Sequence, residues 1–186
     1  MSYRTWWRGL LGCGALWALL FTAPITQAAE PKPAGSPALE FAFEAHVTID
    51  APIVVGTGPQ GLRRIVPITG GKFEGPRIKG TILNGGADWQ FVRADGVLQI
   101  EAKYTLRTSD GVTIMIINRG MRHGPPAVID RLAKGEPVDP SLYYFRTVAE
   151  FEAPSDSPYA WLNKALFVST AERQATQVNL RFYEVK

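Results

Sequence analysis

A period-two alternation of apolar and polar side chains constrains the fold of this chain more than any other feature. In 98–107 ("LQIEAKYTLR") every second residue is apolar, and 39–50 ("LEFAFEAHVTID") follows the same pattern. Successive side chains of a strand point to opposite faces of a sheet, whereas a helix needs a period near 3.6. Both segments are therefore predicted to be half-buried β-strands.

Two Asp-Gly pairs flank the second of these strands. Asp95-Gly96 precedes it, Asp110-Gly111 follows it, and the apolar run 112–118 ("VTIMIIN") comes next. Asp-Gly is a preferred hairpin turn because both residues tolerate the positive φ values that such turns require. Residues 88–118 are thus predicted to form a three-stranded antiparallel meander.

The rest of the chain adds more strands and one short helix. A short helix is predicted near "PPAVIDRLAKGE" (125–136), with proline at its start and Gly135 just past its end. The further strand candidates are 63–70, 76–83, 142–152, 164–173 and 176–185. About 8–9 strands in a single domain over 39–186 predict an all-β fold, a single antiparallel up-and-down β-barrel, or failing that a sandwich. A barrel of about eight strands is filled by its own side chains or holds one small ligand.

The first residues have the features of a secretory signal peptide. Arg4 and Arg8 precede a short apolar run, and Thr26-Gln27-Ala28 suits cleavage after Ala28. We therefore expect a signal peptide at 1–28, a flexible Pro/Ala/Gly tether at 29–38, and a periplasmic or secreted location with no membrane attachment after cleavage. An uncleaved anchor is the alternative, although the apolar run is shorter than the roughly 20 residues that span a bilayer.

Composition excludes several classes of function. Cys13, the only cysteine, lies in the predicted signal, so no disulfide, thiol nucleophile or thiolate metal site is expected in the mature chain. Loss of residues 1–28 would lower the net charge from +3 to +1, and no basic run with interleaved aromatic residues is present, so nucleic acid is not an expected partner. No Gly-x-Ser-x-Gly elbow, phosphate-binding loop or His-x-x-x-His pair occurs. No metal or cofactor is predicted.

Five motifs in order resemble one known family. They are "ITGGKFEGPRIKGTILNGGADW", "RADG", "YTLRTSDGVTI", "YYFRTVAEFE" and "YAWLN". Together they resemble the domain-of-unknown-function family 3237, also called uncharacterised protein family 0311, from about Leu39 to Val185. The resemblance implies a compact antiparallel β-barrel. It implies little about activity, because most of the family has no assigned reaction.

Asp88 and Trp89 follow a flexible double glycine and form the first candidate site. The Asp88 carboxylate either caps a turn by accepting from backbone amides or points into the barrel as a proton acceptor or ligand anchor. Trp89 either plugs a barrel end or stacks on a ligand.

The strand at 142–152 supplies the second candidate. By alternation Tyr144 and Arg146 share a face with Val148 and Glu150, while the opposite face is more apolar. If Tyr144 and Arg146 point inwards they can hold an oxyanion; the alternative is a surface Arg146–Glu150 ion pair. Which face points inwards stays open.

The remaining candidates lie in turns and loops. If "YAWLN" is extended, Tyr159, Trp161 and Asn163 share one side and suit a mostly apolar pocket. Glu74 either closes a turn or acts as a base, which needs burial to raise its pKa. His123 is either a proton shuttle or a solvated loop residue.

These features lead to three functional hypotheses. The first is a barrel that binds a small molecule and acts as a cofactor-free acid–base enzyme of isomerase, lyase or cyclase type on a polar aromatic or carbonyl compound. In it Asp88 is the acid/base, Arg146 and Tyr144 hold the oxyanion, and Trp89 and Trp161 form walls. The second is a periplasmic ligand carrier without turnover. The third is a structural envelope-interaction protein with a filled barrel. The oligomeric state is open.

Overall fold

The computed structural model describes residues 35–186, and its barrel occupies the compact unit Pro37–Lys186. The predicted signal peptide, its cleavage point after Ala28, Cys13 and most of the predicted tether lie outside the described residues. Among the described residues, no helix has both the length and the apolar character needed to cross a lipid bilayer.

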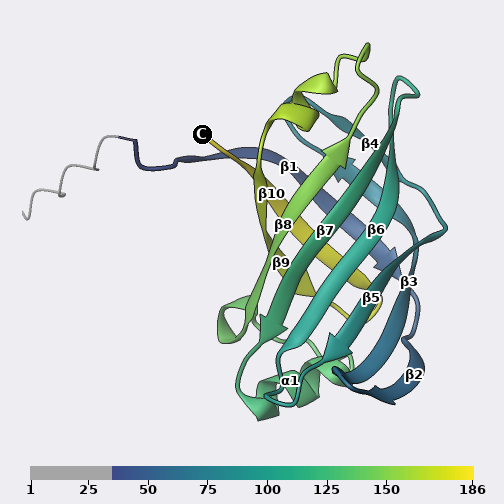
Figure 1. The fold of residues 1–186 in the computed structure, drawn as a ribbon, viewed down its shortest axis with the longest axis vertical. Coiled ribbons are helices and arrows are strands. Elements are labelled where there is room, and N and C mark those ends of the chain that lie inside the picture. Colours follow the sequence, from purple (N-terminus) through teal and green to yellow (C-terminus); the bar gives the residue numbers. More distant parts are fainter. Residues whose placement is uncertain (1–34) are drawn as a thin grey trace, which may run out of the picture. The chain divides into compact units, whose positions relative to one another are not determined.

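The fold is a closed antiparallel β-barrel with eight strand positions, two extra strands and one short α-helix (Figure 1). The strands are β1 (Leu39–Ile49), β2 (Ile53–Gly58), β3 (Gly61–Glu74), β4 (Lys79–Ile82), β5 (Gly86–Val92), β6 (Leu98–Thr108), β7 (Thr113–His123), β8 (Tyr144–Glu152), β9 (Phe167–Arg173) and β10 (Gln177–Val185). The helices are α1 (Pro126–Ala133) and two 3-10 turns, η1 (Pro140–Leu142) and η2 (Ala160–Lys164).

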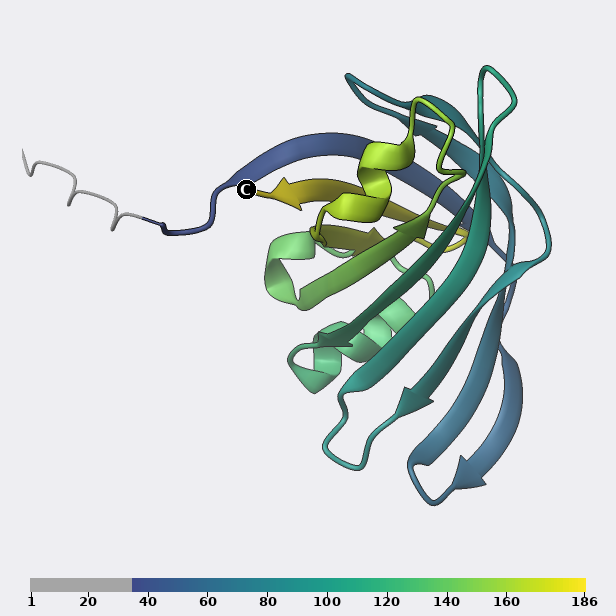
Figure 2. The ribbon, with the colours of Figure 1, turned by 45° about the horizontal axis from the view of Figure 1, so that its top comes forward.

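Pairing between β1 and β3 closes the barrel, and the other neighbours follow the order β1, β10, β9, β8, β7, β6. β4 and β5 share one position between β6 and β3, while β2 continues the line of β1 along β3. Figure 2 shows these strands curving round one interior. The predicted barrel and the meander formed by β5, β6 and β7 are confirmed.

Alternation decides which side chains enter the barrel. In β6 the buried residues are those of the predicted apolar face, from Leu98 to Leu106. In β8 the buried set is Phe145, Thr147, Ala149 and Phe151, which answers the question left open for this strand. The more apolar face points inwards because its burial removes more apolar surface from water.

One half of the interior is filled by aromatic rings. Phe43 stacks on Phe182 with ring centroids 4.6 Å apart, and Phe151 meets Phe167 edge to face at 4.9 Å. Phe43 also packs against Phe73 at 5.8 Å. These five phenylalanines, which we call the aromatic plug, lie toward the end that carries η2, drawn in yellow-green at the top of Figure 1.

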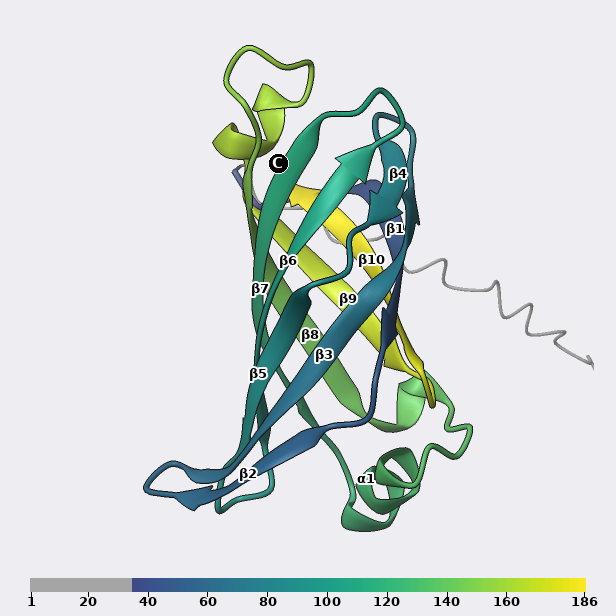
Figure 3. The ribbon, with the colours of Figure 1, turned by 90° about the vertical axis from the view of Figure 1, so that its right-hand side faces the viewer.

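The opposite end carries α1 and the hairpin of β2 and β3, which extends beyond the neighbouring strands (Figure 3). Leu132 of α1 is buried. Proline at the first helical position has no amide hydrogen to satisfy, and Gly135 just past the helix has φ 75°, so this helix has the boundaries that its sequence predicts.

The local structure differs from the sequence reading at two places. The condition set for "YAWLN" is not met, because residues 160–164 form the turn η2, so Tyr159, Trp161 and Asn163 do not alternate along a strand. β2 was missed, because "IVVGTG" contains two glycines and has no alternation; its apolar side chains are exposed and β3 alone pairs with it among the described strands.

Candidate functional site

The half of the barrel next to α1 contains a cavity of about 100 Å³. Its apolar wall includes Val47, Ile49, Val66, Ile68, Ile100 and Leu180, and its polar wall contains Arg64, Asp88, Gln90, Tyr104, Asn118, Arg122, Thr147 and Arg173. Leu132 and Ala133 of α1 border it. A single water needs only about 10–15 Å³ of such space, so the barrel is not filled by its own side chains.

Asp88 projects into this cavity from β5. Its Oδ2 accepts a hydrogen bond from Gln90 Nε2 at 2.5 Å, and its Oδ1 accepts from the backbone amide of Glu101 at 3.0 Å. Gln90 is held in turn, because its Oε1 accepts from Arg64 Nε at 2.7 Å. The carboxylate is therefore fixed from two sides and faces the interior.

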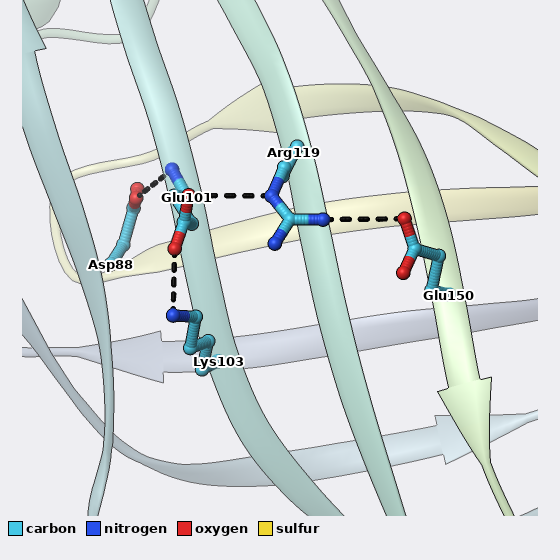
Figure 4. A network of polar contacts seen from close by, with 5 residues as sticks. All are labelled: Asp88, Glu101, Lys103, Arg119 and Glu150. Carbon is cyan, nitrogen blue, oxygen red and sulfur yellow. Dashed lines mark hydrogen bonds and ion pairs between the residues drawn. The ribbon is translucent and has the colours of Figure 1, made fainter.

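A local gap in the sheet explains the bond from Glu101. Between β5 and β6, Asp88 is opposite Ala102 and Phe91 is opposite Gln99, while the pairing skips the two residues between Asp88 and Phe91. The Glu101 amide instead donates a hydrogen bond to the Asp88 carboxylate (Figure 4). The Glu101 side chain instead contacts Lys103 and Arg119 on the outer face. Asp88 thus accepts from a backbone amide of the neighbouring strand and also faces the cavity, while its role as proton acceptor or ligand anchor stays a prediction.

The surroundings of Asp88 raise the pKa of its carboxyl to about 6. Burial is the main cause, since a desolvated carboxylate loses its hydration. The hydrogen bonds from Gln90 and Glu101 and the positive charges of Arg122 and Arg64 oppose that rise. A carboxyl with this pKa exchanges its proton near neutral pH.

Three arginines share the cavity with this one carboxyl. The pKa of Arg122 is lowered to about 10, mainly by burial and also by the positive charges of Arg64 and Arg173. Burial also lowers the pKa values of Arg64 and Arg173. None of the three forms an ion pair with a described residue, since no carboxylate oxygen lies within 4.0 Å of their nitrogens.

Three buried polar atoms have no hydrogen-bond partner within the described chain. They are Tyr104 Oη, Asn118 Oδ1 and Arg122 Nε, and all three residues line the cavity. Buried polar atoms without partners are rare in proteins because each costs desolvation free energy. Burial, and then the negative charge of Asp88, raises the pKa of Tyr104, so its hydroxyl stays protonated and able to donate.

The structure places the predicted pair Tyr144 and Arg146 elsewhere. Both are exposed on the outer face of the barrel, where the Arg146 guanidinium lies 5.4 Å from the Tyr144 ring centroid and donates to the Phe145 carbonyl. His123 stacks on Tyr144 at 4.9 Å. The expectation that this pair points inwards is corrected, because the apolar face of β8 fills the interior. Glu150 pairs with Arg119 at 3.2 Å, not with Arg146.

Trp89 also lies outside. It alternates with Asp88, is 39% exposed, and has Lys103 Nζ at 5.8 Å from its ring centroid. Adjacent residues of a strand point to opposite faces, so Asp88 and Trp89 cannot both face the cavity. Trp89 therefore neither walls this cavity nor plugs the barrel.

The other predicted residues gather at the η2 end, away from the cavity. Trp161 packs on Phe167 and beneath the Arg77 guanidinium, and Tyr159 Oη donates to Asp110 Oδ1 at 3.1 Å. Asn163 bonds both the amide and the carbonyl of Ala153 at 2.8 Å. Glu74 is exposed at the end of β3. Of the predicted site residues, Asp88 is the one that the structure brings into the cavity.

Sequence reasoning missed the other polar members of the cavity, although a signal existed. Tyr104 lies on the same strand face as the buried Leu98 and Ile100. Asn118 likewise shares a face with the buried Ile116, and Arg64 shares one with the buried Val66. A polar residue in the buried phase of an alternating strand marks a site that must be satisfied from within. Arg122 was placed in a loop, whereas β7 continues to His123. No cluster of three or more His, Cys, Asp or Glu side chains suited to a metal occurs between residues 35 and 186.

Residues 37–185 match the family of proteins of unknown function DUF3237. The chain belongs to this family. The DUF3237 chain is 40% identical over 147 residues to the UPF0311 protein CA_C3321 of Clostridium acetobutylicum, covering 78% of this chain and 92% of that one.

Solved structures of two similar proteins have the same fold as this chain. The protein of unknown function RPA1785 from Rhodopseudomonas palustris has a TM-score of 0.77 at 36% identity, with 84% of this chain and 100% of that chain covered. A β-barrel-like protein from Acinetobacter baumannii has a TM-score of 0.71 at 40% identity, covering 85% and 100%.

A more distant relative is named as an enzyme. The hydroalkoxylation enzyme phnH of Penicillium herquei is 32% identical over 80 residues, which cover 43% of this chain and 53% of that one. A solved enzyme structure from Penicillium herquei has a TM-score of 0.61 at 23% identity, with 86% and 99% covered, and shares the fold.

Proposed function

We propose that this protein binds a small organic molecule in the barrel cavity and carries out cofactor-free acid–base chemistry on it at Asp88. The reaction would be an isomerisation, elimination or cyclisation of a polar aromatic or carbonyl compound. One observation carries the proposal: a carboxyl with a pKa of about 6 faces a cavity that also contains a buried tyrosine hydroxyl without a partner among residues 35–186.

In this reaction Asp88 is the general base that accepts a proton from the substrate. A general base works best when its pKa lies near the working pH, because it is then both ionised and basic enough to accept a proton. Gln90 and the Glu101 amide hold the carboxylate in one orientation, so little reorganisation is needed when the proton moves. The proton accepted from one atom of the substrate can be returned to another.

In this reaction Tyr104 donates a hydrogen bond to the developing oxyanion. Its hydroxyl is neutral, buried and without a hydrogen-bond partner in the described part of the chain, so it can donate to a substrate oxygen without first breaking another bond. In a site with little water such a donor stabilises negative charge more than it does in solution. Asp88 and Tyr104 would therefore act on the same substrate, one removing a proton and the other stabilising the charge.

The distant Penicillium relative supports this class of chemistry. A hydroalkoxylation adds an O–H bond across a carbon–carbon double bond, which requires proton transfers and no net change of oxidation state. The sequence likeness covers 80 residues at 32% identity. It supports acid–base chemistry in this barrel and leaves the substrate to be found. If residues 1–28 act as a signal peptide, the reaction takes place in the periplasm or outside the cell.

The experiment compares turnover and binding in one variant. Mature protein, residues 29–186, is screened by thermal unfolding against small aromatic acids, phenols and lactones, since a ligand that binds the native state raises the melting temperature. Ligands that bind are then followed by NMR for conversion. We expect Asp88→Asn to keep the melting shift and to reduce turnover by about 100-fold or more.

The matched control is Glu74→Gln, which removes an exposed carboxylate away from the cavity and should change neither property. Full turnover in Asp88→Asn would overturn the catalytic role. Binding without turnover in the wild type would instead identify a carrier, the second hypothesis of the sequence analysis.

A further inference from the structure

We propose that the ligand of this cavity is an organic carboxylate carrying a hydroxyl group, held at its carboxylate by Arg64, Arg122 and Arg173. This inference rests on the proposed function, in that it takes the cavity as the ligand site, and it names the class of molecule bound there. It is carried by the charge balance of the cavity, by the unpartnered atoms in its wall, and by the apolar surface beside them.

The charge balance leaves an excess of positive charge. The charged side chains of the cavity wall are three arginines and Asp88. Moving a guanidinium out of water is costly unless an anion compensates it, and like charges crowded together add to that cost. A bound anion would supply the missing compensation.

Most arginines elsewhere on the barrel behave differently. Five of the eight others in residues 35–186 pair with a carboxylate, at N–O distances from 2.5 to 3.8 Å; they are Arg77, Arg93, Arg119, Arg131 and Arg181. The other three, Arg63, Arg107 and Arg146, form no ion pair with a described residue, but they lie outside the cavity wall. The cavity arginines lack such partners within residues 35–186, although they are the more deeply buried group. The described carboxylates that pair with arginines lie at the surface, where solvent already screens charge. The cavity arginines therefore remain without a described carboxylate, and an external anion could compensate them.

Arg122 is the centre of the proposed anion site. It is 7% exposed, its Nε has no hydrogen-bond partner among the described residues, and its guanidinium carbon lies 5.7 Å from the Phe145 ring centroid. A guanidinium presents a planar fork of donors that matches the two oxygens of a carboxylate, so both can be bound in one plane. Arg173 is held near Tyr143, whose hydroxyl accepts from the Arg173 amide at 2.9 Å.

A second atom requires a donor on the ligand. Asn118 Oδ1 is a buried acceptor to which no group in residues 35–186 donates, and Asn118 is 2% exposed. Neither a carboxylate nor a hydrocarbon can donate to it, whereas a hydroxyl group can. Asn118 and Arg122 lie on the same face of β7, four residues apart, so one ligand can meet both.

The remaining surface is apolar. Val47, Ile49, Val66, Ile68, Ile100 and Leu180 line the cavity next to the polar groups. A ring or short chain packs against such a wall, which a bare inorganic anion would leave uncovered. The complement of the whole cavity is therefore a small hydroxylated organic acid.

The test measures binding to purified wild-type protein by thermal unfolding and calorimetry. The probes are 2-, 3- and 4-hydroxybenzoate, benzoate, and salicylamide, which matches 2-hydroxybenzoate in shape but is neutral; inorganic phosphate is the purely ionic probe. We expect at least one hydroxybenzoate to bind about 10- to 100-fold more tightly than the neutral amide, as is typical of charge-assisted hydrogen bonds. Benzoate should bind more weakly than that hydroxybenzoate.

Two variants of β7 locate the site. Arg122→Gln should remove the preference for the anion, whereas Arg119→Gln, on the outer face of the same strand, should keep it. The wild-type comparison of acid with amide stands by itself if Arg122→Gln does not fold.

Equal affinity for acid and amide would overturn the inference, as would stabilisation by phosphate without any by the organic acids. Neither result bears on turnover at Asp88, which the Asp88→Asn comparison decides separately.

Discussion

At the residue scale, the function proposed for this barrel depends on a few polar side chains in the buried phase of otherwise apolar strands. Asp88 has its hydrogen bonds satisfied by Gln90 and Glu101, while Tyr104 keeps an unpaired hydroxyl. The first arrangement fixes a group and the second keeps a group available. Burial of either polar group costs folding free energy, and interactions with a bound ligand can offset that cost.

The pH dependence of stability should reveal Asp88. Because the pKa of its carboxyl is about 6 in the folded protein and near 3.8 in the unfolded chain, the folded state binds this proton more tightly. Stability from this group is full below pH 4 and is lost as the pH rises through 6, by on the order of 3 kcal/mol. Chemical unfolding at pH 5 and pH 7 should show a decrease that Asp88→Asn reduces. Asp156→Asn, at an exposed carboxyl, should leave the decrease unchanged.

Two tyrosines should respond in opposite ways to loss of their hydroxyl. Tyr104→Phe removes a buried hydroxyl without a partner, so we expect unchanged or higher stability together with lower turnover. Tyr143→Phe leaves the Arg173 amide without its acceptor and should lower the free energy of unfolding by about 1–2 kcal/mol. Urea unfolding of both variants gives the comparison. A large loss of stability in Tyr104→Phe would mean that its hydroxyl has a partner in solution.

At the element scale, the position of β5 between β3 and β6 aims Asp88 into the barrel. A Cβ at Gly86 would lie 2.5 Å from Tyr104 Cβ and 2.7 Å from the Lys103 carbonyl oxygen. Glycine therefore lets β5 approach β6 closely where the strand begins, two residues before Asp88. The second glycine of "NGGADW" is thus required by packing against β6.

Gly86→Ala should destabilise the fold and disturb the site together. We expect a loss of about 1–3 kcal/mol, the usual cost of overpacking, with weaker ligand binding because Asp88 and Tyr104 shift relative to each other. Gly58→Ala is the control, since a Cβ at Gly58 meets nothing within 4 Å. Urea unfolding and ligand titration of both variants measure the effects. Equal stability of the two variants would contradict the close approach.

At the scale of the whole molecule, the barrel divides its interior between stability and binding. The aromatic plug fills the η2 end, and the cavity occupies the α1 end. Since most of the stabilising free energy of a core comes from buried apolar surface, the plug can offset the cost of unpaired polar atoms in the cavity.

Phe43 is the residue on which to test this division. It is fully buried and contacts three other rings, so Phe43→Ala should lower the free energy of unfolding by about 3–5 kcal/mol. Val148→Ala, on the outer face and 51% exposed, should cost less than about 0.5 kcal/mol. Denaturant unfolding gives both values. A small effect of Phe43→Ala would show that the plug is not the main source of stability.

The sequence alone determined the strands other than β2, the meander and the barrel class. Alternation in 98–107 is a local property, and the burial of that strand's apolar face follows from it. The same local pattern could not decide which face of 142–152 points inwards, because both faces contain aromatic residues and the choice depends on strands far along the chain. Asp88 is predicted from the glycines and tryptophan beside it, whereas Arg146 and Tyr144 are predicted from their chemistry alone, which does not give the direction of their side chains.

Only the tertiary structure decided the composition of the site. Arg64, Asp88, Arg122 and Arg173 come from β3, β5, β7 and β9, and closure of the barrel brings them to one cavity. Their burial, their lack of ion-pair partners among the described residues, and the raised pKa of Asp88 are properties of that enclosed space. Periodicity fixes which way a side chain points relative to its own strand, and the closed barrel fixes what it meets there.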